Sequence, residues 1–323
     1  MLFLALAVAC SLGIAALFKI AERREMDRTA LLTVNYAAAA GLALALQGTG
    51  QAEAITPGLV ALGVTQGVLF IAGFWLFSLA IRRAGMGLAA GVMRLSVVIP
   101  VLASWAIWGE IPRPLQLVGL ALAGAAFVLV ARPAGAPGKR GPATGSPRLG
   151  TEAERPGTRS VIGLLTLLFL CGGIVDTLMK AFGERYAATV DESLFLLFVF
   201  GVAFLVGAVV VIMKGMRTGD WPSREVWIWG TVLGLINYAS ADFLLRAVEV
   251  LSGPVVFPAN SVAIVLGAAL LGSLIWKERL SRANLAGLAL AAVALACLTL
   301  EPNAEAAPEP EPRPRASVHA PDA

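Results

Sequence analysis

The sequence predicts an all-α membrane protein whose chain crosses the bilayer ten times, as two inverted repeats of five helices each. Three observations lead to this fold class. Hydrophobic residue types make up 58% of the 323 residues and charged types only 14%, whereas soluble domains are nearer one half and one quarter. The chain contains ten long apolar segments, and the second half repeats motifs of the first.

Each apolar segment is close to the roughly 20 residues that a helix needs to cross a bilayer core. Helix is the expected form, because open strand edges leave backbone groups unsatisfied in lipid. The first segment is interpreted as a retained helix rather than a signal peptide, since Lys19 and Arg23 follow its apolar run. The predicted spans are residues 1–20, 29–47, 57–81, 86–109, 115–132, 160–181, 193–213, 225–248, 252–276 and 283–300.

Two segments lack the composition of a packed bundle. Residues 133–159 are rich in glycine, proline and charge and are interpreted as a flexible linker. Residues 301–323 are interpreted as a disordered tail. The expected organisation is therefore a five-helix repeat over residues 1–132, the linker, a second five-helix repeat over residues 160–300, and the tail.

The two halves align without a gap when residues 85–130 are placed on residues 253–298. An odd number of spans returns the chain on the opposite side of the membrane, so the second repeat is expected to be inverted. Inverted repeats are typical of secondary transporters, which hold their substrate near the midplane between the halves. The matched motifs are Trp108-x-Glu110 with Trp276-x-Glu278, and GLALA at 119–123 with GLALA at 287–291.

The cysteines and the single histidine exclude several chemistries. Cys10, Cys171 and Cys297 lie in apolar segments without the spacing of a disulfide framework or a metal site. His319 lies in the tail, so neither a buried histidine base nor a histidine-ligated metal is expected. No span holds a G-x-S-x-G or a nucleotide-binding motif. We therefore expect no enzyme, no cofactor and, because the net charge of +4 is dispersed, no nucleic-acid partner.

The positive residues predict an orientation. We call the side of the membrane that carries the N-terminus side A and the opposite side B. Most lysines and arginines outside the spans fall on side B. The positive-inside rule then places side B in the cytoplasm and both termini outside.

Motifs at equivalent places in the two halves give a family resemblance. Each half ends with a helix-end Trp-x-Glu, a short turn and a glycine-rich fifth helix, in the segments WGEIPRPLQLVGLALAGAAFV and WKERLSRANLAGLALAAVALA. The segments RLSVVIPVLASWAIWGE and FPANSVAIVLGAALLG add to the pattern. The chain resembles the ten-helix EamA-like transporters of the drug/metabolite transporter superfamily over residues 1–132 and 160–300. The resemblance implies an alternating-access carrier, a central cavity lined by helices 1, 3, 4, 6, 8 and 9, and cytoplasmic termini, contrary to the charge rule.

Ionisable residues inside spans are costly, so each is a candidate for function. Asp176 and Lys180 are spaced i,i+4 and share a helix face, and Asp242 and Arg246 repeat this spacing. Either each pair is a structural salt bridge, or its carboxylate exchanges the basic partner for a proton or a cationic substrate. Arg94 is expected to face the interior or one of these aspartates, where it binds an anionic substrate group or forms a structural ion pair.

Prolines and polar residues predict hinges and cavity walls. Pro100 and Pro258 lie inside spans at related repeat positions, and each loosens its helix, so both are candidate hinges or packing kinks. Glu110 lies at a tight turn and is expected to fix that turn, and Gln66 is expected to join two helices. The predicted substrate-binding residues are Arg94, Ser96, Asn237, Tyr238, Asn260 and Ser261.

Together these features predict a multi-pass carrier of the bacterial inner membrane that moves a small metabolite or drug by alternating access. Two carboxylates inside spans make proton-coupled antiport or efflux the first expectation. A lipid-carrier flippase on the same fold is the alternative. The expected partners are a small-molecule substrate, the lipid bilayer and protons, and a monomer is sufficient for such a mechanism.

Overall fold

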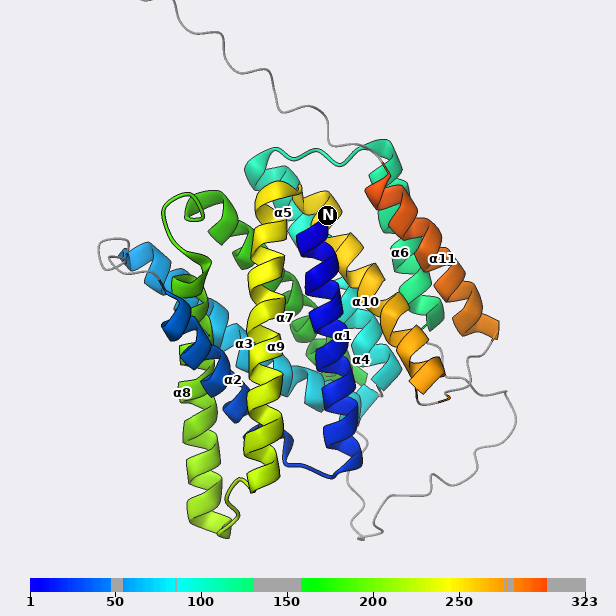
Figure 1. Ribbon diagram of the computed structural model, residues 1–323. Coiled ribbons are helices and arrows are strands. Elements are labelled where there is room, and N and C mark those ends of the chain that lie inside the picture. The colour runs from blue at the N-terminus through cyan, green and yellow to red at the C-terminus, as the bar shows by residue number, and fades with distance from the viewer. Residues whose placement is uncertain (48–54, 85, 131–157, 276, 278–281, 301–323) are drawn as a thin grey trace, which may run out of the picture.

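The computed structural model describes residues 1–47, 55–84, 86–130, 158–275, 277 and 282–300, and all regular secondary structure in these residues is helical (Figure 1). The tail predicted over 301–323, nearly all of the linker predicted over 133–159, and Trp276 and Glu278 lie outside the described residues. The helices are α1 (Leu2–Arg23), α2 (Arg28–Leu46), α3 (Pro57–Ala84), α4 (Met86–Leu95), α5 (Val98–Trp108), α6 (Pro114–Val130), α7 (Thr158–Arg185), α8 (Glu192–Thr218), α9 (Arg224–Val250), α10 (Gly253–Ile275) and α11 (Arg282–Thr299).

The helices confirm an all-α polytopic membrane protein. Within the described residues, nine helical segments are long and apolar enough to cross a membrane, and α4 and α5 together supply one of them. The remaining predicted span, residues 115–132, corresponds to α6, an apolar helix of 17 residues. Each predicted span therefore has a helical counterpart at nearly the predicted bounds.

One predicted helix is interrupted. The sequence predicts a single helix over residues 86–109, but α4 ends at Leu95 and α5 begins at Val98. Pro100 explains the break, because it has no N–H to donate to the carbonyl of Ser96, four residues earlier. The Ile99 N–H binds that carbonyl instead, at 2.9 Å, in a tighter i→i+3 turn.

Pro258 behaves differently, since α10 continues through it as one helix. It stands in the second turn of α10, where few helical hydrogen bonds precede it. The predicted hinge at Pro258 therefore has no break in the helix to support it. The two prolines therefore differ in their effect, since only Pro100 stands at an interruption of its span.

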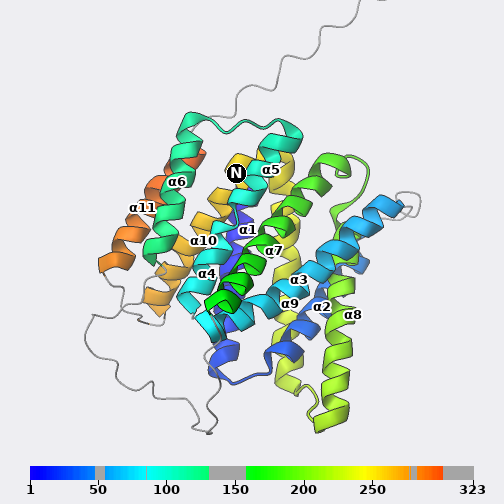
Figure 2. The ribbon, with the colours of Figure 1, turned by 180° about the vertical axis from the view of Figure 1, so that it is seen from behind.

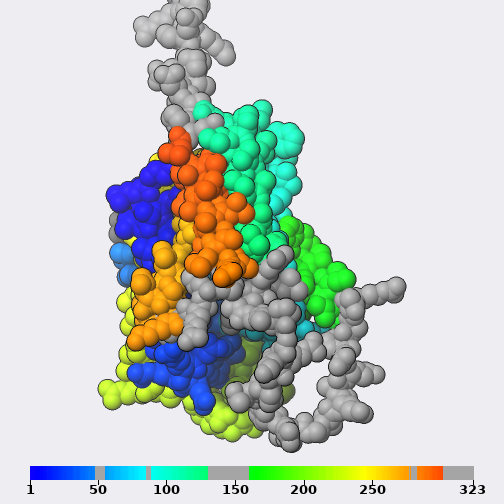
Figure 3. All heavy atoms as spheres, turned by 90° about the vertical axis from the view of Figure 1, so that its right-hand side faces the viewer, coloured from blue at the N-terminus to red at the C-terminus, as the bar shows by residue number. Residues whose placement is uncertain are grey.

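Helices from the two halves of the chain pack on one another. α2 contacts α8 and α9, while α8 contacts α2 and α3. α1 packs against α9 and α10, while α7 packs against α3, α4 and α5. α6 and α11 lie side by side at one edge of the bundle (Figures 1 and 3). The interior is thus built mainly from contacts between the first five spans and the last five.

Small residues allow these close contacts. Gly234 on α9 faces α2, where a Cβ at this position would overlap the carbonyl oxygen of Asn35 and lie 2.7 Å from the Cβ of Ala38. Gly119 on α6 faces α11, where a Cβ would lie 3.1 Å from the carbonyl oxygen of Ala294. Close backbone approach of this kind is the usual way in which membrane helices gain packing contacts.

Two turns share an unusual backbone conformation. Gly109, after α5, has a φ of 70°, and Lys277, after α10, has a φ of 54°. Each is the central residue of a Trp-x-Glu motif, and the two positions correspond in the alignment of the halves. The lysine adopts a left-handed conformation that favours glycine, so the two halves share a residue of positive φ at this position.

The α2–α9 contact gives a test of the packing. Gly234→Ala is expected to lower the free energy of unfolding by about 1–3 kcal/mol, because the added methyl group has no space against α2. Gly41→Ala is the matched control, since a Cβ at Gly41 meets nothing within 4 Å and alanine favours helix. Equilibrium unfolding in detergent measures both, and equal stability of the two variants would contradict the described packing.

Candidate functional site

The break between α4 and α5 lies against α7, as the view from behind shows (Figure 2). Gly172 and Gly173 on α7 make this approach possible, since a Cβ at Gly172 would lie 2.7 Å from the Ser96 Oγ and one at Gly173 would overlap Ile99. The Ser96 side chain is buried, and its Oγ donates to the carbonyl oxygen of Met93 at 2.5 Å. The interrupted span of the first half is therefore fixed on a glycine pair of the second half.

Arg94 and Asp176 are two charged residues near this helix contact. Arg94 is the penultimate residue of α4, and Asp176 stands one helical turn after Gly172 on the same face of α7. Both side chains are partly buried, and each acts electrostatically on the other. A cation at the end of a half-helix is also favoured by the negative end of the helix dipole. The structure thus brings together two of the predicted site residues from different halves of the chain.

A buried amide holds α7 beside this pair. The Gln66 Nε2 on α3 donates to the carbonyl oxygen of Val175 at 3.1 Å, and Gln66 is fully buried. The predicted role of Gln66 in joining two helices has this hydrogen bond as support. Its Oε1 is one of a few buried side-chain atoms in the described residues that have no hydrogen-bond partner, so an acceptor lies next to the backbone that carries Asp176.

Lys180 does not pair with Asp176. Its Nζ binds the Glu110 Oε1 at 2.7 Å and the Glu184 Oε1 at 2.5 Å, and the lysine is only 2% exposed. The pair predicted from the i,i+4 spacing is therefore replaced by one partner from the α5–α6 turn and one a turn further along α7. Glu110 also accepts a hydrogen bond from the Gly253 N–H at 2.7 Å, so it joins α7 to the start of α10.

Asp242 and Arg246 form the pair that their spacing predicts. The Arg246 Nε and one terminal nitrogen donate to the two carboxylate oxygens of Asp242, at 2.9 and 3.2 Å. The guanidinium also lies 3.4 Å from a Glu192 oxygen at the start of α8. Asp242 is 14% exposed, and this bidentate arrangement is typical of a strong structural ion pair.

The other predicted site residues lie apart from Arg94. Tyr238 is buried, with its ring centroid 6.5 Å from that of Phe200, in the apolar cluster between α2, α8 and α9. Asn237 is partly buried on α9, and Ser261 is buried on α10. The Asn260 Oδ1 is a buried acceptor without a hydrogen-bond partner among the described residues. The structure therefore gives no single cluster that contains all the predicted substrate-binding residues.

Two acidic residues were not singled out by the sequence analysis. Glu184 binds Lys180 and Glu192 binds Arg246. The i,i+4 spacing from Lys180 to Glu184 was a usable signal, but Glu184 lies at the end of its span and resembles an ordinary interfacial residue. The Glu192–Arg246 contact joins residues 54 positions apart, and nothing local in the sequence indicates it.

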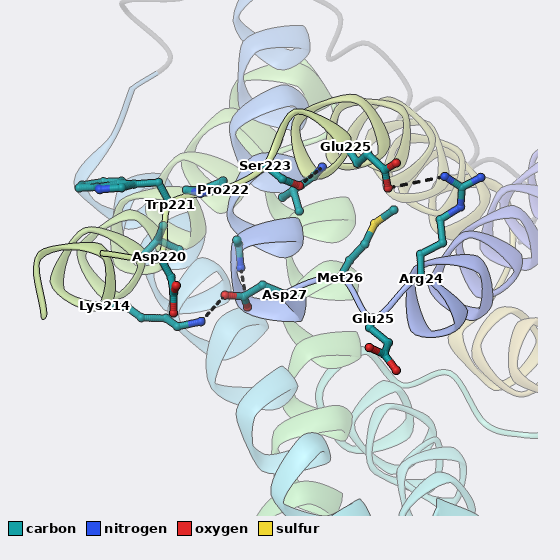
Figure 4. Close-up of a pocket in the computed structure, with 13 residues that line it drawn as sticks. Arg24, Glu25, Met26, Asp27, Lys214, Asp220, Trp221, Pro222, Ser223 and Glu225 are labelled. Atoms are coloured by element: carbon teal, nitrogen blue, oxygen red, sulfur yellow. Dashed lines mark hydrogen bonds and ion pairs between the residues drawn. The ribbon is translucent and has the colours of Figure 1, made fainter. Parts of the chain in front are cut away.

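A pocket of about 310 Å³ lies at the end of the bundle away from the N-terminus, between the α1–α2 turn and the α8–α9 loop (Figure 4). Ion pairs cross its walls: the Lys214 Nζ lies 2.6 Å from an Asp27 oxygen, and an Arg24 nitrogen lies 3.6 Å from a Glu225 oxygen. These pairs connect the first two spans to α8 and α9. They are largely exposed and act as links between loops.

Asp27 also caps α2 through the N–H groups of Thr29 and Ala30. Burial raises the pKa of Asp27, but the hydrogen bonds from Lys214 and from these two N–H groups outweigh that effect. The pKa of the carboxyl therefore lies below its ordinary value of 3.8. The ionised form is favoured in the folded protein, so Asp27 stabilises the fold at neutral pH.

The Lys180 cluster predicts a large loss of stability on truncation. Lys180→Ala is expected to lower the free energy of unfolding by about 3 kcal/mol, because it leaves the carboxylates of Glu110 and Glu184 without their buried cation. Lys214→Ala is the control, since Lys214 is 45% exposed and exposed pairs contribute at most about 1 kcal/mol. Denaturation in detergent compares the two variants. A loss of stability for Lys180→Ala no larger than that for Lys214→Ala would contradict a buried structural role for the Lys180 cluster.

Asp27 predicts a pH-dependent difference between wild type and Asp27→Asn. A carboxyl with a lowered pKa in the folded state contributes stability above its unfolded pKa and loses it as the pH falls through the folded pKa. The wild type should therefore be the more stable protein at pH 7, with the difference disappearing below about pH 4. Melting temperatures across this range measure it, and a difference that grows toward acid would contradict it.

Comparison with known proteins supports the same fold. Residues 1–132 match the family model described as the EamA-like transporter family, which confirms the predicted resemblance over this part of the chain. An uncharacterized protein of Haemophilus influenzae is 26% identical over 296 residues, covering 87% of this chain and 92% of that one. A protein of known crystal structure superposes with a TM-score of 0.66 at 17% identity, covering 93% and 96% of the two chains. At this identity, the structural likeness shows the fold alone.

Proposed function

We propose that this protein, whose first 132 residues match the EamA-like transporter family, moves a small metabolite or drug across the bacterial inner membrane by alternating access. The observation that carries the proposal is that Arg94 and Asp176 act electrostatically on one another near the interruption between α4 and α5. Ionisable side chains this deep in apolar spans are costly and generally mark a substrate or ion pathway. Broken helices at such a site are a recurring feature of transporters.

Several features support two inverted repeats over residues 1–132 and 160–300. The helix contacts persist when the two halves are exchanged, so that α2 on α9 corresponds to α8 on α3, and α1 on α9 corresponds to α7 on α3. The turns at Gly109 and Lys277 correspond in conformation. α6 and α11 run in opposite directions in Figure 1. With this organisation Arg94 and Asp176 come from different repeats, where transporters of this kind hold their substrate.

Of the two candidate carboxylates, Asp176 is the better carrier of a coupling proton. Asp242 is held bidentately by Arg246 close to the end of α9, and a proton would have to displace a strong ion pair there. Asp176 has no such bidentate partner among the described residues, since its neighbouring Lys180 is engaged by Glu110 and Glu184. Exchange of its proton for the substrate would be the antiport that the sequence predicts, whereas joint movement would be symport.

This assignment predicts different effects for the two aspartates. In proteoliposomes that contain the purified protein and a substrate found by thermal-shift screening, Asp176→Asn should abolish the dependence of flux on a pH gradient. Asp242→Asn, the matched control, should keep that dependence even if its stability falls. Intact coupling in Asp176→Asn would remove Asp176 from this role, and no flux of any stabilising ligand by the wild type would refute transport itself.

A further inference from the structure

We infer that the substrate is an anion which binds the Arg94 guanidinium in place of the Asp176 carboxylate, and that it crosses the membrane together with the proton that neutralises Asp176. This inference rests on the proposed transport function. It names both the chemical class of the substrate and the direction of coupling. It departs from the antiport expected from the sequence, and the reason is the charge balance of the site.

Arg94 has the chemistry and the position of an anion-binding group. A guanidinium offers five N–H donors in a planar fork that matches carboxylate and phosphate oxygens. The first turn of α5 begins four residues after Arg94, at Val98, so the positive end of a second half-helix lies beside the same point. Half-helix ends that meet at the membrane centre are used elsewhere to hold anionic substrate groups.

Asp176 occupies the place that such an anion would take. The carboxylate of Asp176 is the negative group that acts on Arg94 in the structure, so an incoming anion must compete with it. A proton on Asp176 removes the competitor and turns the side chain into an O–H donor that can face the bound anion. Proton binding and anion binding therefore reinforce each other, and the coupling is reciprocal.

The net charge of the site distinguishes symport of an anion with a proton from movement of an anion alone and from exchange of a cation for a proton. With Arg94 charged and Asp176 ionised, the empty site is neutral, and with one proton and one monovalent anion added it is neutral again. An anion without a proton leaves the site with one net negative charge. Exchange of a cation for a proton leaves one net positive charge in both states. Net charge in the apolar interior is costly, so symport of an anion with a proton is the coupled scheme that keeps both crossing states neutral.

Other charged groups do not alter this balance. The described charged residues on the elements packed against α7 lie toward the ends of their helices, apart from Arg94. On α7 itself, Lys180 is held by the carboxylates of Glu110 and Glu184, a separate cluster whose charge is the same with and without a bound anion. The remaining groups are Arg82 and Arg83 on α3, Arg224, Glu225, Asp242, Arg246 and Glu249 on α9, and Arg185 on α7.

The test is a thermal-shift titration of the purified full chain in detergent at pH 5.5 and 7.5. The probes are monocarboxylates and alkyl sulfonates, which stay monovalent at both pH values, the amides and amines with the same carbon skeletons, and the corresponding amino acids. Anions should stabilise the protein, and their dissociation constants should rise by up to about tenfold per pH unit as Asp176 loses its proton. The matched amides and amines should give no shift.

Variants separate the two side chains. Asp176→Asn should bind the anion equally well at both pH values, and Arg94→Gln should not bind it. Arg246→Gln, the control, should keep both the binding and its pH dependence. If Arg94→Gln alone does not fold, the double variant Arg94→Gln/Asp176→Asn removes both charges together and should also fail to bind the anion. Arg94→Lys should retain weaker binding of the same anion class.

Several outcomes overturn the inference. These are stabilisation by amines, amides or amino acids instead of anions, no anion that stabilises the protein, and an anion affinity that is constant or stronger at pH 7.5. Flux measurements separate this failure from failure of the proposed function. An anion that binds through Arg94 but never crosses proteoliposomes refutes transport alone, whereas Asp176-dependent flux of a cation or a neutral molecule refutes the anion site alone.

Discussion

Hydrocarbon offers no partner to a charge, and the whole arrangement of polar groups in this protein follows from that constraint. Every ionisable side chain inside a span must find its counter-charge within the protein. Lys180 does so with Glu110 and Glu184, and Arg246 does so with Asp242 and Glu192. Both clusters combine short contacts with positions near helix ends. They are therefore suited to holding helices together.

The central pair has a different character. Arg94 and Asp176 lie where α4 ends, on elements from different halves of the chain. The approach of α4 and α5 to α7 beside them depends on two backbone features, the interruption caused by Pro100 and the glycine pair of α7 that admits Ser96 and Ile99. A site built on an interrupted helix can change its charges with a small local rearrangement, which a continuous helix resists because its backbone hydrogen bonds lie in one unbroken ladder.

Much of the fold could be predicted from the sequence, because bilayer thickness fixes the length of an apolar helix and lipid excludes other backbone forms. The break at Leu95–Val98 could not, since Pro100 and Pro258 are equivalent by local criteria and only one interrupts its helix. The site was only partly predictable for a related reason. The i,i+4 rule identifies Asp242–Arg246 correctly, but the pair it suggests between Asp176 and Lys180 does not form, and the partner Glu110 lies 70 positions from Lys180.

The central pair and the Lys180 cluster are mechanically connected. Asp176 and Lys180 stand one turn apart on the same face of α7, so a shift of α7 that separates Asp176 from Arg94 also moves Lys180 relative to Glu110. Glu110 in turn holds the first N–H of α10, and Gly253 is packed so closely on Ser104 that no larger residue fits there. Charge exchange at the centre is thereby linked to the α5–α6 turn and the start of α10, at the end of the bundle where the N-terminus lies. In the proposed transport cycle, protonation of Asp176 is therefore coupled to the contacts at that end.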